Sequence, residues 1–237
     1  PIQKILIHDG HFFPWRKGDI HTQYGLIKEA DLKKAKTEVA SHIGNVFKVL
    51  EPGFQDLLVR AKRGPQIILN KDLGMILLST NLDKNSLVVE AGSGSGFSAM
   101  NFSRFVKKVV SYERREEFQK IAQENATTLG LKNITFKAQD IYEGIDEKNV
   151  DLILLDLAEP WKVVEHSFKA LKQGGYFIAY LPNITQVVEF IKEAEKKFMI
   201  LKIIELLERE WHIEEQRVRP ASSMIGHTAF LCFLRKI

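Results

Sequence analysis

The sequence predicts an α/β fold in which a doubly wound, mostly parallel sheet of seven strands follows a small β-rich domain. Three observations support it. From about residue 72 onward, apolar strand-like runs alternate with helix-like segments. The first of these runs leads into the glycine-rich stretch E-A-G-S-G-S-G at 90–96. The first sixty residues contain only short β-leaning runs broken by Gly and Pro. Alternating strands and helices imply parallel crossover connections.

The first 62 residues are predicted to form the small β-rich domain. Short β-leaning runs occupy 5–15 and 19–27, and a strand at 45–50 ends at the sequence E-P-G. A basic helical or irregular connector follows over 54–64. Residues 63–237 are then predicted to form the α/β domain, since the short β-leaning runs broken by Gly and Pro end before this point.

The elements of the α/β domain follow from apolar periodicity and from glycine stops. We expect helices at 72–79, 97–106, 115–129, 163–171 and 185–198, and strands at 86–91, 108–113, 134–140, 150–157 and 176–181. Two last apolar runs, 201–211 and 227–234, are predicted to form an antiparallel pair. Ligands of such sheets bind beyond the carboxyl ends of the strands, so residues that end strands are the candidate site residues.

Composition and charge narrow the class of protein. Of 237 residues, 45% are hydrophobic and 27% charged, with one cysteine, Cys232. One cysteine excludes an internal disulfide, and no apolar run approaches the roughly 20 residues of a membrane span, so we expect a cytoplasmic protein outside the membrane. The net charge of +4 lies entirely in the first 63 residues. This asymmetry fits a polyanionic partner or a randomly basic surface equally well.

The glycine-rich stretch predicts a nucleoside-binding loop. Gly92, Gly94 and Gly96 close the first sheet strand and open a helix, with Ser93 and Ser95 between them. Glycines there permit positive φ and close approach of a ligand to the backbone.

Glu113 ends the next strand, 17 residues after the last glycine of the loop. A carboxylate at this spacing can accept hydrogen bonds from both ribose hydroxyls. The alternative is a solvated glutamate at a strand end. After a glycine loop at this spacing, we favour the nucleoside-binding role.

Glu90 favours S-adenosylmethionine over a dinucleotide as the cofactor. The pattern is E-x-G-x-G-x-G rather than G-x-G-x-x-G, and it places an acid at the strand end. An anion is unfavourable beside pyrophosphate, whereas it suits a ligand with an amino group or a sulfonium.

With these motifs, residues 87–181 resemble the core of class I S-adenosylmethionine-dependent methyltransferases. Asp140, which ends the third strand, falls where that superfamily places an acid or amide near the adenine ring. The alternative is that Asp140 only caps the following turn.

The stretch L154-L-D-L-A-E-P-W161 narrows the resemblance further. D-L-A-E-P-W resembles D-L-P-E-P-W of the TrmI family, with Ala158 in place of a proline. R63-G-P-Q-I-I-L-N-K-D72 and R219-P-A-S-S-M-I-G-H-T-A-F-L231 also resemble segments of that family. The first of them lies over the cofactor in the family, which makes Gln66 a cofactor-binding candidate. The resemblance implies a homotetrameric tRNA (adenine-N1)-methyltransferase acting on T-loop adenine 58, with adenine 57 as a second candidate.

Asp156, at the end of the fourth strand, is the candidate catalytic residue and is also expected beside the cofactor. Adenine N1 carries an in-plane lone pair, so it needs no deprotonation to attack a methyl group. It needs removal from the base stack and alignment with the bond that breaks. A carboxylate that accepts from the adjacent N6 amine supplies this alignment and stabilises the charge that develops on the base. The alternative is an aspartate that only orients a turn.

Four residues are candidates for tRNA contact: Arg60, Arg63, Arg219 and His227. For each, a solvated or structural role is the alternative, and no metal site is predicted. Two other functions stay open. One is a small-molecule methyltransferase of the corrin-ring type, and the other is a non-catalytic tRNA-binding partner subunit. The second should have a degraded glycine loop, whereas the glycines, Glu113 and Asp156 are all present.

Overall fold

The computed structural model describes residues 2–62, 64 and 67–237. The chain divides into two compact units, Pro1–Ala61 and Lys62–Ile237. Within the described residues, no helix is both long and apolar enough to cross a bilayer.

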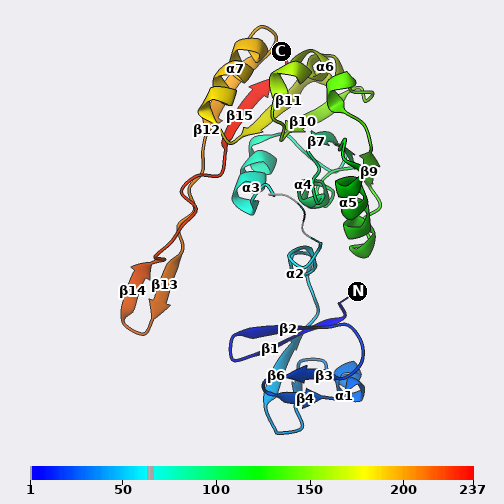
Figure 1. Cartoon of the computed structure of the whole chain (residues 1–237), viewed down its shortest axis with the longest axis vertical. Helices are drawn as coiled ribbons and strands as arrows, with labels where there is room; N and C mark the ends of the chain where they lie inside the picture. Colours follow the sequence, from blue (N-terminus) through cyan, green and yellow to red (C-terminus); the bar gives the residue numbers. More distant parts are fainter. Residues whose placement is uncertain (1, 63, 65–66) are drawn as a thin grey trace. The chain divides into compact units, whose positions relative to one another are not determined.

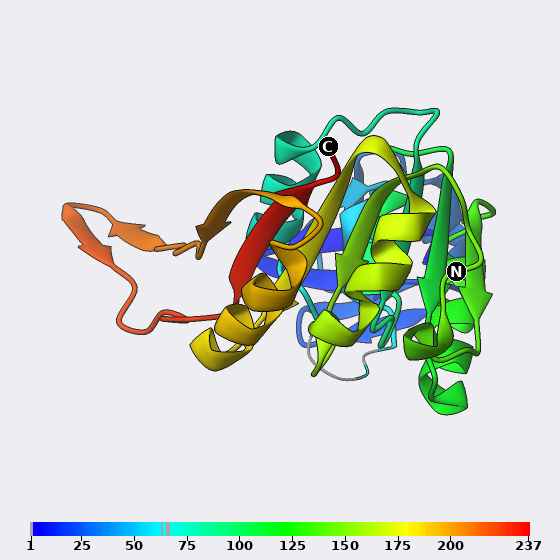
Figure 2. The same ribbon diagram turned by 90° about the horizontal axis from the view of Figure 1, so that it is seen from above.

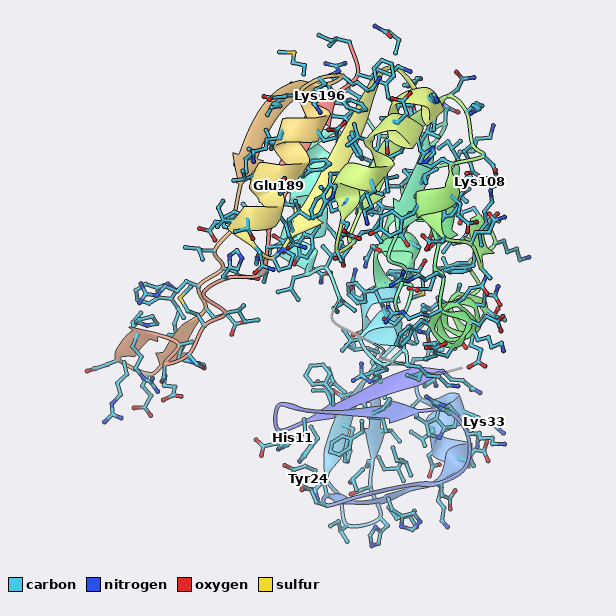
Figure 3. All side chains as sticks on the ribbon, turned by 45° about the horizontal axis from the view of Figure 1, so that its top comes forward. His11, Tyr24, Lys33, Lys108, Glu189 and Lys196 are labelled. Carbon is cyan, nitrogen blue, oxygen red and sulfur yellow. The ribbon has the colours of Figure 1, made fainter. Side chains whose placement is uncertain are left out.

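The first unit is a small antiparallel sheet with its own core. Its strand order is β2 (His11–Trp15), β1 (Lys4–His8), β6 (Val46–Leu50) and β5 (Glu38–Ala40). The short pair β3 (Ile20–Thr22) and β4 (Gly25–Ile27) and the helices α1 (Glu29–Lys34) and α2 (Phe54–Leu58) complete the unit. Leu6, Trp15 and Phe47 belong to its buried core. Tyr24 packs at the rim of this core, with its ring centroid 6.0 Å from that of His11 (Figure 3).

The second unit contains the predicted seven-stranded sheet (Figure 1). Its strands are β7 (Leu87–Ala91), β8 (Lys108–Tyr112), β9 (Ile134–Lys137), β10 (Val150–Leu155), β11 (Leu171–Leu181), β12 (Met199–Ile204) and β15 (Phe230–Arg235). They are ordered β12-β15-β11-β10-β7-β8-β9, and only β15 runs antiparallel to its neighbours. The predicted doubly wound, mostly parallel fold is confirmed.

Helices cover both faces of the sheet because its strands are apolar on both sides. The unit's helices are α3 (Asn70–Ser79), α4 (Phe97–Phe102), α5 (Glu116–Thr128), α6 (Val164–Ala170) and α7 (Ile184–Ala194), with 3₁₀ turns η1 (Ile141–Glu143) and η2 (Pro160–Val163). One buried cluster joins the sheet to α6 and α7, and a second joins it to α3 and α4. Figure 2 shows α6 and α7 in front of the sheet and α3 behind it. In α7, Val187 and Phe190 are buried, whereas Glu189 extends outward (Figure 3).

The structure corrects the prediction of a single strand across residues 201–211. Strand β12 ends at Ile204, and the charged stretch 205–210 has no regular structure. The chain then forms a separate hairpin, β13 (Trp211–Glu214) with β14 (Arg217–Pro220), which extends away from the sheet (Figure 1). The antiparallel pairing of β12 with β15 agrees with the prediction.

Candidate functional site

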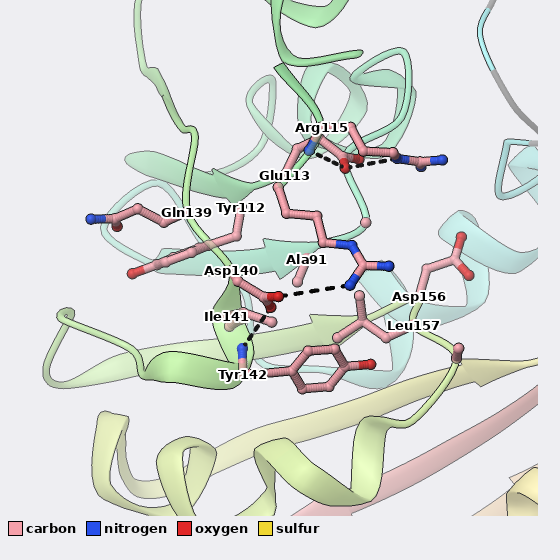
Figure 4. A pocket seen from close by; sticks show the side chains of 13 residues that line it. Ala91, Tyr112, Glu113, Arg115, Gln139, Asp140, Ile141, Tyr142, Asp156 and Leu157 are labelled. Atoms are coloured by element: carbon pink, nitrogen blue, oxygen red, sulfur yellow. Dashed lines mark hydrogen bonds and ion pairs between the residues drawn. The ribbon is translucent and has the colours of Figure 1, made fainter. Parts of the chain in front are cut away.

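A pocket of about 200 Å³ lies beyond the carboxyl ends of strands β7, β8, β9 and β10 (Figure 4). The strand order reverses between β7 and β10, because β8 and β9 follow on one side and β11 on the other. Such a switch point is where open α/β sheets bind ligands. The lining residues are Ala91, Gly92, Tyr112, Glu113, Arg114, Arg115, Gln139, Asp140, Ile141, Tyr142, Asp156, Leu157 and Ala158.

The glycine loop is shaped by two close approaches. Gly92 has φ +92°, and a Cβ built on it would lie 2.2 Å from the backbone oxygen of Asp156. Gly96 has φ +80°, and its Cβ would lie 2.9 Å from Cβ of Ala122 on α5. Neither position accepts a side chain without movement of the backbone or of a packed helix. The loop is therefore bound tightly to the end of β10 and to α5.

The serines of the loop point inward. The Ser93 hydroxyl is hydrogen-bonded to the Ser111 hydroxyl and donates to the Tyr112 carbonyl at 3.2 Å. Ser93 and Ser95 are both buried. Of the five predicted loop residues, 92–96, only Gly92 is in the pocket wall. A ligand contact by the others stays a prediction.

Glu113 lies in the pocket wall, and its carboxylate is almost fully buried. It accepts from the Gly94 backbone N–H at 3.2 Å and from the Arg115 backbone N–H at 3.1 Å. Arg115 Nε also donates to it at 3.2 Å. These bonds hold the carboxyl group just after β8, directly against the glycine loop.

Asp140 also lies in the pocket wall, and it caps the following turn. Its Oδ1 accepts from the Tyr142 N–H at 3.0 Å, so the capping role considered for this residue is observed. Its Oδ2 lies 3.8 Å from Arg114 Nη1 (Figure 4). Capping fixes one oxygen, whereas the other lies toward Arg114, which is also in the pocket wall.

Asp156 directly follows β10 in the same wall, and its backbone N–H donates to the Ala91 carbonyl at 3.0 Å. Burial of the carboxyl, and then the negative charge of Glu90, raise the pKa of Asp156 from 3.8 to about 7. A strongly perturbed carboxyl in a pocket is typical of functional sites, because such a site keeps a group poised to change its hydrogen bonding or charge.

The carboxyl of Glu90 is held by two serine hydroxyls at the end of β7. Its carboxyl accepts from the Ser98 hydroxyl and from the Ser111 hydroxyl, the latter at 2.6 Å. It is almost fully buried and is not among the lining residues. Burial raises the pKa of Glu90, whereas the two serine bonds act in the opposite direction. A cofactor contact by Glu90 stays a prediction.

Because the pKa of Asp156 is raised in the folded protein, the stability of the fold should depend on pH. A raised pKa means that the folded chain binds the proton more tightly than the unfolded chain. The carboxyl therefore favours folding below about pH 4, and this contribution is lost as the pH rises through about 7. We expect Asp156→Asn to melt at a higher temperature than the wild type at about pH 8, with the gap closing toward about pH 4. Thermal unfolding of both proteins across this range checks it, and a gap independent of pH would contradict it.

The remaining candidates are dispersed. Gln66 and Arg63 lie outside the described residues. Arg60 follows α2 in the first unit, and its guanidinium donates to the Asp56 carbonyl at 2.8 Å. Arg219 is exposed on the hairpin strand β14, where it donates to the Ser222 hydroxyl at 3.3 Å.

His227 is held by two partners. Its Nδ1 lies 2.8 Å from a Glu205 carboxylate oxygen, and its Nε2 lies 2.9 Å from the Pro182 carbonyl. The hydrogen bond to Glu205, followed by that to Pro182, raises the pKa of His227. These bonds tie the segment before β15 to the ends of β11 and β12, which is a structural task. A tRNA contact by this histidine stays a prediction.

Several pocket residues escaped the sequence analysis. Arg114, Ile141 and Leu157 each follow a strand-end acid by one position. Tyr142 is an aromatic wall residue whose hydroxyl accepts from the Glu159 N–H at 3.2 Å. The position directly after each predicted strand-end carboxylate was the available signal.

A buried polar network was also missed. Lys71 donates to both oxygens of the fully buried Asp72, at 2.9 and 3.0 Å, and to the Thr228 hydroxyl at 2.8 Å. Tyr180 lies within 3.5 Å of Asp72. This network joins α3 to the end of β11 and to the segment before β15.

The sequence also matches a known protein family. The family model described as "tRNA methyltransferase complex GCD14 subunit" matches residues 57–225, most of the chain. The chain belongs to this GCD14 family. The predicted resemblance to tRNA (adenine-N1)-methyltransferases is thereby confirmed at the level of the family.

Two characterised relatives of this GCD14-family chain match it over most of their length. The tRNA (adenine(57)-N(1)/adenine(58)-N(1))-methyltransferase TrmI of Methanocaldococcus jannaschii is 36% identical over 90% of this chain and 86% of its own. The tRNA (adenine(58)-N(1))-methyltransferase TrmI of Thermus thermophilus is 33% identical over 94% of this chain and 91% of its own.

Solved structures agree in fold. A SAM-dependent O-methyltransferase from Thermotoga maritima has a TM-score of 0.89 and 31% identity, and covers 100% of this chain and 93% of its own. The tRNA (m1A58) methyltransferase TrmI from Aquifex aeolicus has a TM-score of 0.85 and 29% identity, over 99% of this chain and 96% of its own. A precorrin-6y C5,15-methyltransferase from Geobacter metallireducens, at 11% identity, shares the fold alone. The GCD14-family chain thus has the fold of S-adenosylmethionine-dependent methyltransferases.

Proposed function

We propose that the protein transfers a methyl group from S-adenosylmethionine to N1 of an adenine in the T loop of tRNA, at position 58, with position 57 as a second candidate target. The observation that carries the proposal is the pocket at the switch point. There, the Asp156 carboxyl lies beside the glycine loop in the same wall as Glu113 and Asp140. By their names, the TrmI enzymes of Methanocaldococcus jannaschii and Thermus thermophilus act on these adenines.

The residues of the pocket fit the nucleoside part of the proposed cofactor. Glu113 and Asp140 offer carboxylate oxygens to the donors of a nucleoside, namely the ribose hydroxyls and the adenine amine. The same acids disfavour a pyrophosphate at this place. A volume of about 200 Å³ is below the roughly 300–1,000 Å³ typical of whole-ligand pockets, so it suits the nucleoside part alone. When bound, S-adenosylmethionine supplies the electrophilic methyl group.

Asp156 is proposed to hold the target base. Asp156 lies in the pocket wall at the carboxyl ends of the strands, next to Gly92 and Leu157. Its carboxylate accepts a hydrogen bond from the N6 amine of an adenine that has been flipped out of the base stack. This bond fixes the ring so that N1 points along the line of attack. As positive charge spreads onto the base, the carboxylate stabilises it. The N1 lone pair attacks directly, so the chain need not provide a base.

Two features argue against the alternatives. A non-catalytic partner subunit does not need an intact cofactor pocket. In this chain, Gly92, Glu113 and Asp156 all line the same pocket. The corrin-ring methyltransferase shares the fold at 11% identity and 76% coverage of this chain, whereas the tRNA enzyme from Aquifex aeolicus covers 99%. The first unit, Pro1–Ala61, thus finds its counterpart in the tRNA enzyme.

The decisive experiment incubates the purified protein with labelled S-adenosylmethionine and an unmodified tRNA transcript, then identifies the modified nucleoside by mass spectrometry. We expect 1-methyladenosine in the T loop. A transcript with both T-loop adenines replaced is the control and should take up no label. Label found in another nucleoside, or in both transcripts, would contradict the proposal.

Contact with tRNA phosphates is proposed for Arg60 and Arg63, which flank the boundary of the two units. Replacement of both by alanine should weaken tRNA binding and reduce the slope of log K against log salt by about one per lost phosphate contact. Binding titrations at several salt concentrations measure this slope. Lys196→Ala, in the exposed turn that follows α7, is the matched control and should leave the slope unchanged. An unchanged slope in the double variant would remove both arginines from the interface.

A homotetramer is proposed from the exposed apolar residues of the second unit. On the β13–β14 hairpin, Trp211 is 58% exposed, and the cross-strand pair Ile213 and Val218 is 73% and 62% exposed. Isolated two-stranded hairpins are at best marginally stable in water, so this one requires a partner surface. Strand β12, at the sheet edge, exposes Met199, Leu201 and Ile203 as well. A second copy of this chain offers complementary apolar surfaces, and tRNA methylation fits the cytoplasmic location expected from the sequence.

We therefore expect the double variant Ile213→Asp, Val218→Asp to lower the molar mass in solution from tetramer to smaller species. Light scattering after size-exclusion chromatography measures it. Leu78→Asp, which changes an 87% exposed leucine on α3, is the control and should leave the mass unchanged. Retention of the wild-type mass in the hairpin variant would exclude the hairpin from the interface.

A further inference from the structure

A second polar network lies behind the pocket and is used by none of the roles assigned so far. Tyr112, the last residue of β8, contributes to the pocket wall and is buried. Its hydroxyl donates to Glu147 Oε2 at 2.5 Å, and it accepts from Lys137 Nζ at 3.1 Å and from the Asp146 backbone N–H at 3.3 Å. One phenol oxygen thus joins the ends of β8 and β9 to residues 146–147.

Lys137 strengthens the same junction. Its ammonium lies 2.9 Å from Asp146 Oδ2 and 2.7 Å from Glu147 Oε1. Lys137 and Glu147 are largely buried, with side chains 21% and 14% exposed. Ion pairs with little solvent contact are screened less than surface pairs and hold their geometry better. Burial lowers the pKa of Lys137, but the hydrogen bonds to Glu147, Asp146 and Tyr112 together raise it above its ordinary value, so the ammonium keeps its charge.

The segment held in this way is the loop 138–149, which connects β9 to β10. Its first half supplies Asp140, Ile141 and Tyr142 to the pocket, and its only regular structure is the single turn η1. Ile141 and Ile145 anchor it by burial. The second half has its polar anchors in Tyr112 and Lys137. A long connection with so little internal structure depends on such anchors to keep one shape.

We propose that Tyr112 is a positioning residue for the nucleoside pocket: its hydroxyl, together with Lys137 and Glu147, holds the loop 138–149 in the shape that presents Asp140, Ile141 and Tyr142 to the ligand. The inference rests on the proposed function, since it takes the ligand to be a nucleoside with an adenine amine. Without the hydroxyl, the loop samples other shapes, and the ligand must order it on binding. Affinity for the cofactor then falls, whereas the alignment of Asp156, on the next strand, is kept.

The test compares Tyr112→Phe with the wild type. With S-adenosylhomocysteine as the probe in calorimetry, we expect the dissociation constant to rise about tenfold, as for one lost buried hydrogen bond. In methylation assays, the KM for S-adenosylmethionine should rise while kcat stays close to that of the wild type. Tyr176→Phe is the matched control, since Tyr176 is also buried but lies in the middle of β11, paired with Leu152 of β10 and outside the pocket. It should bind the probe like the wild type.

A second variant tests whether Tyr112 acts through its hydrogen bond to Glu147 or only through packing. Glu147→Ala should weaken probe binding in a similar way, and the double variant Tyr112→Phe, Glu147→Ala should be little worse than either single change. Additive losses would show that the two residues act independently and would overturn the proposal.

Hydrogen exchange on the ligand-free protein gives an answer that needs no activity. In Tyr112→Phe, faster exchange should be confined to the loop 138–149, led by the Asp146 amide that has lost its acceptor. Acceleration spread over the whole sheet, or none in the loop, would overturn the positioning role. If the wild type failed to bind the probe, the proposed function would fail, and the exchange pattern would still decide the role of Tyr112.

Discussion

Asp156→Ala should lower kcat for tRNA methylation by at least about a hundredfold, while the dissociation constant for S-adenosylhomocysteine changes far less. In the proposed function, the carboxylate contacts the target base, and this contact strengthens as positive charge develops during transfer. In the proposed function, the cofactor is held mainly by Glu113, Asp140 and the glycine loop. Single-turnover kinetics with saturating tRNA, together with calorimetry, measure the two quantities separately.

Asp140→Asn is the matched control, because it changes another carboxylate of the same wall. It should raise the KM for S-adenosylmethionine with a smaller effect on kcat. Wild-type turnover in Asp156→Ala would remove this residue from the mechanism. Equal losses of kcat in Asp156→Ala and Asp140→Asn would show that the two acids contribute alike to the pocket. Asp156 would then have no separate role in methyl transfer.

Gly92→Ala should weaken cofactor binding by at least about a hundredfold or abolish it. The new methyl group would lie 2.2 Å from the Asp156 backbone oxygen, at a position with φ +92°. Backbone cannot yield as a flexible side chain does, so the glycine loop and the end of β10 must separate. Calorimetry with S-adenosylhomocysteine and thermal unfolding measure the outcome.

Gly130→Ala controls for the cost of positive φ alone. Gly130 has φ +71°, and a Cβ there would meet no atom within 4 Å. This variant should lose some stability through backbone strain yet bind the cofactor like the wild type. If Gly92→Ala bound as well as Gly130→Ala, the tight junction between the loop and β10 would not matter for the site.

The sequence could predict the strand ends because their signals are local. An apolar run followed by an acid identifies Glu113, Asp140 and Asp156, and the fold brings all three into one pocket. The orientation of Glu90 could not be predicted in this way. Its partners, Ser98 and Ser111, come from α4 and β8, so its position depends on how the helix packs on the sheet.

The hairpin β13–β14 was missed for a different reason. Its strands have four residues each, and its turn at Glu215-Gln216 lacks the glycine or asparagine that indicates a tight turn in sequence. Glu215 adopts φ +52° without that signal. The Tyr112 network was also out of reach, since its partners lie 25 to 35 residues away along the chain.

The central claim is that the Asp156 carboxylate accepts a hydrogen bond from the N6 amine of the target adenine. It is tested most directly with two tRNAs that differ only at the target position, one with adenosine and one with purine riboside, which lacks the amine. We expect the wild type to prefer adenosine by about tenfold or more in kcat/KM, and Asp156→Ala to lose most of this preference. The same preference in both proteins would show that the amine is recognised elsewhere and would contradict the claim.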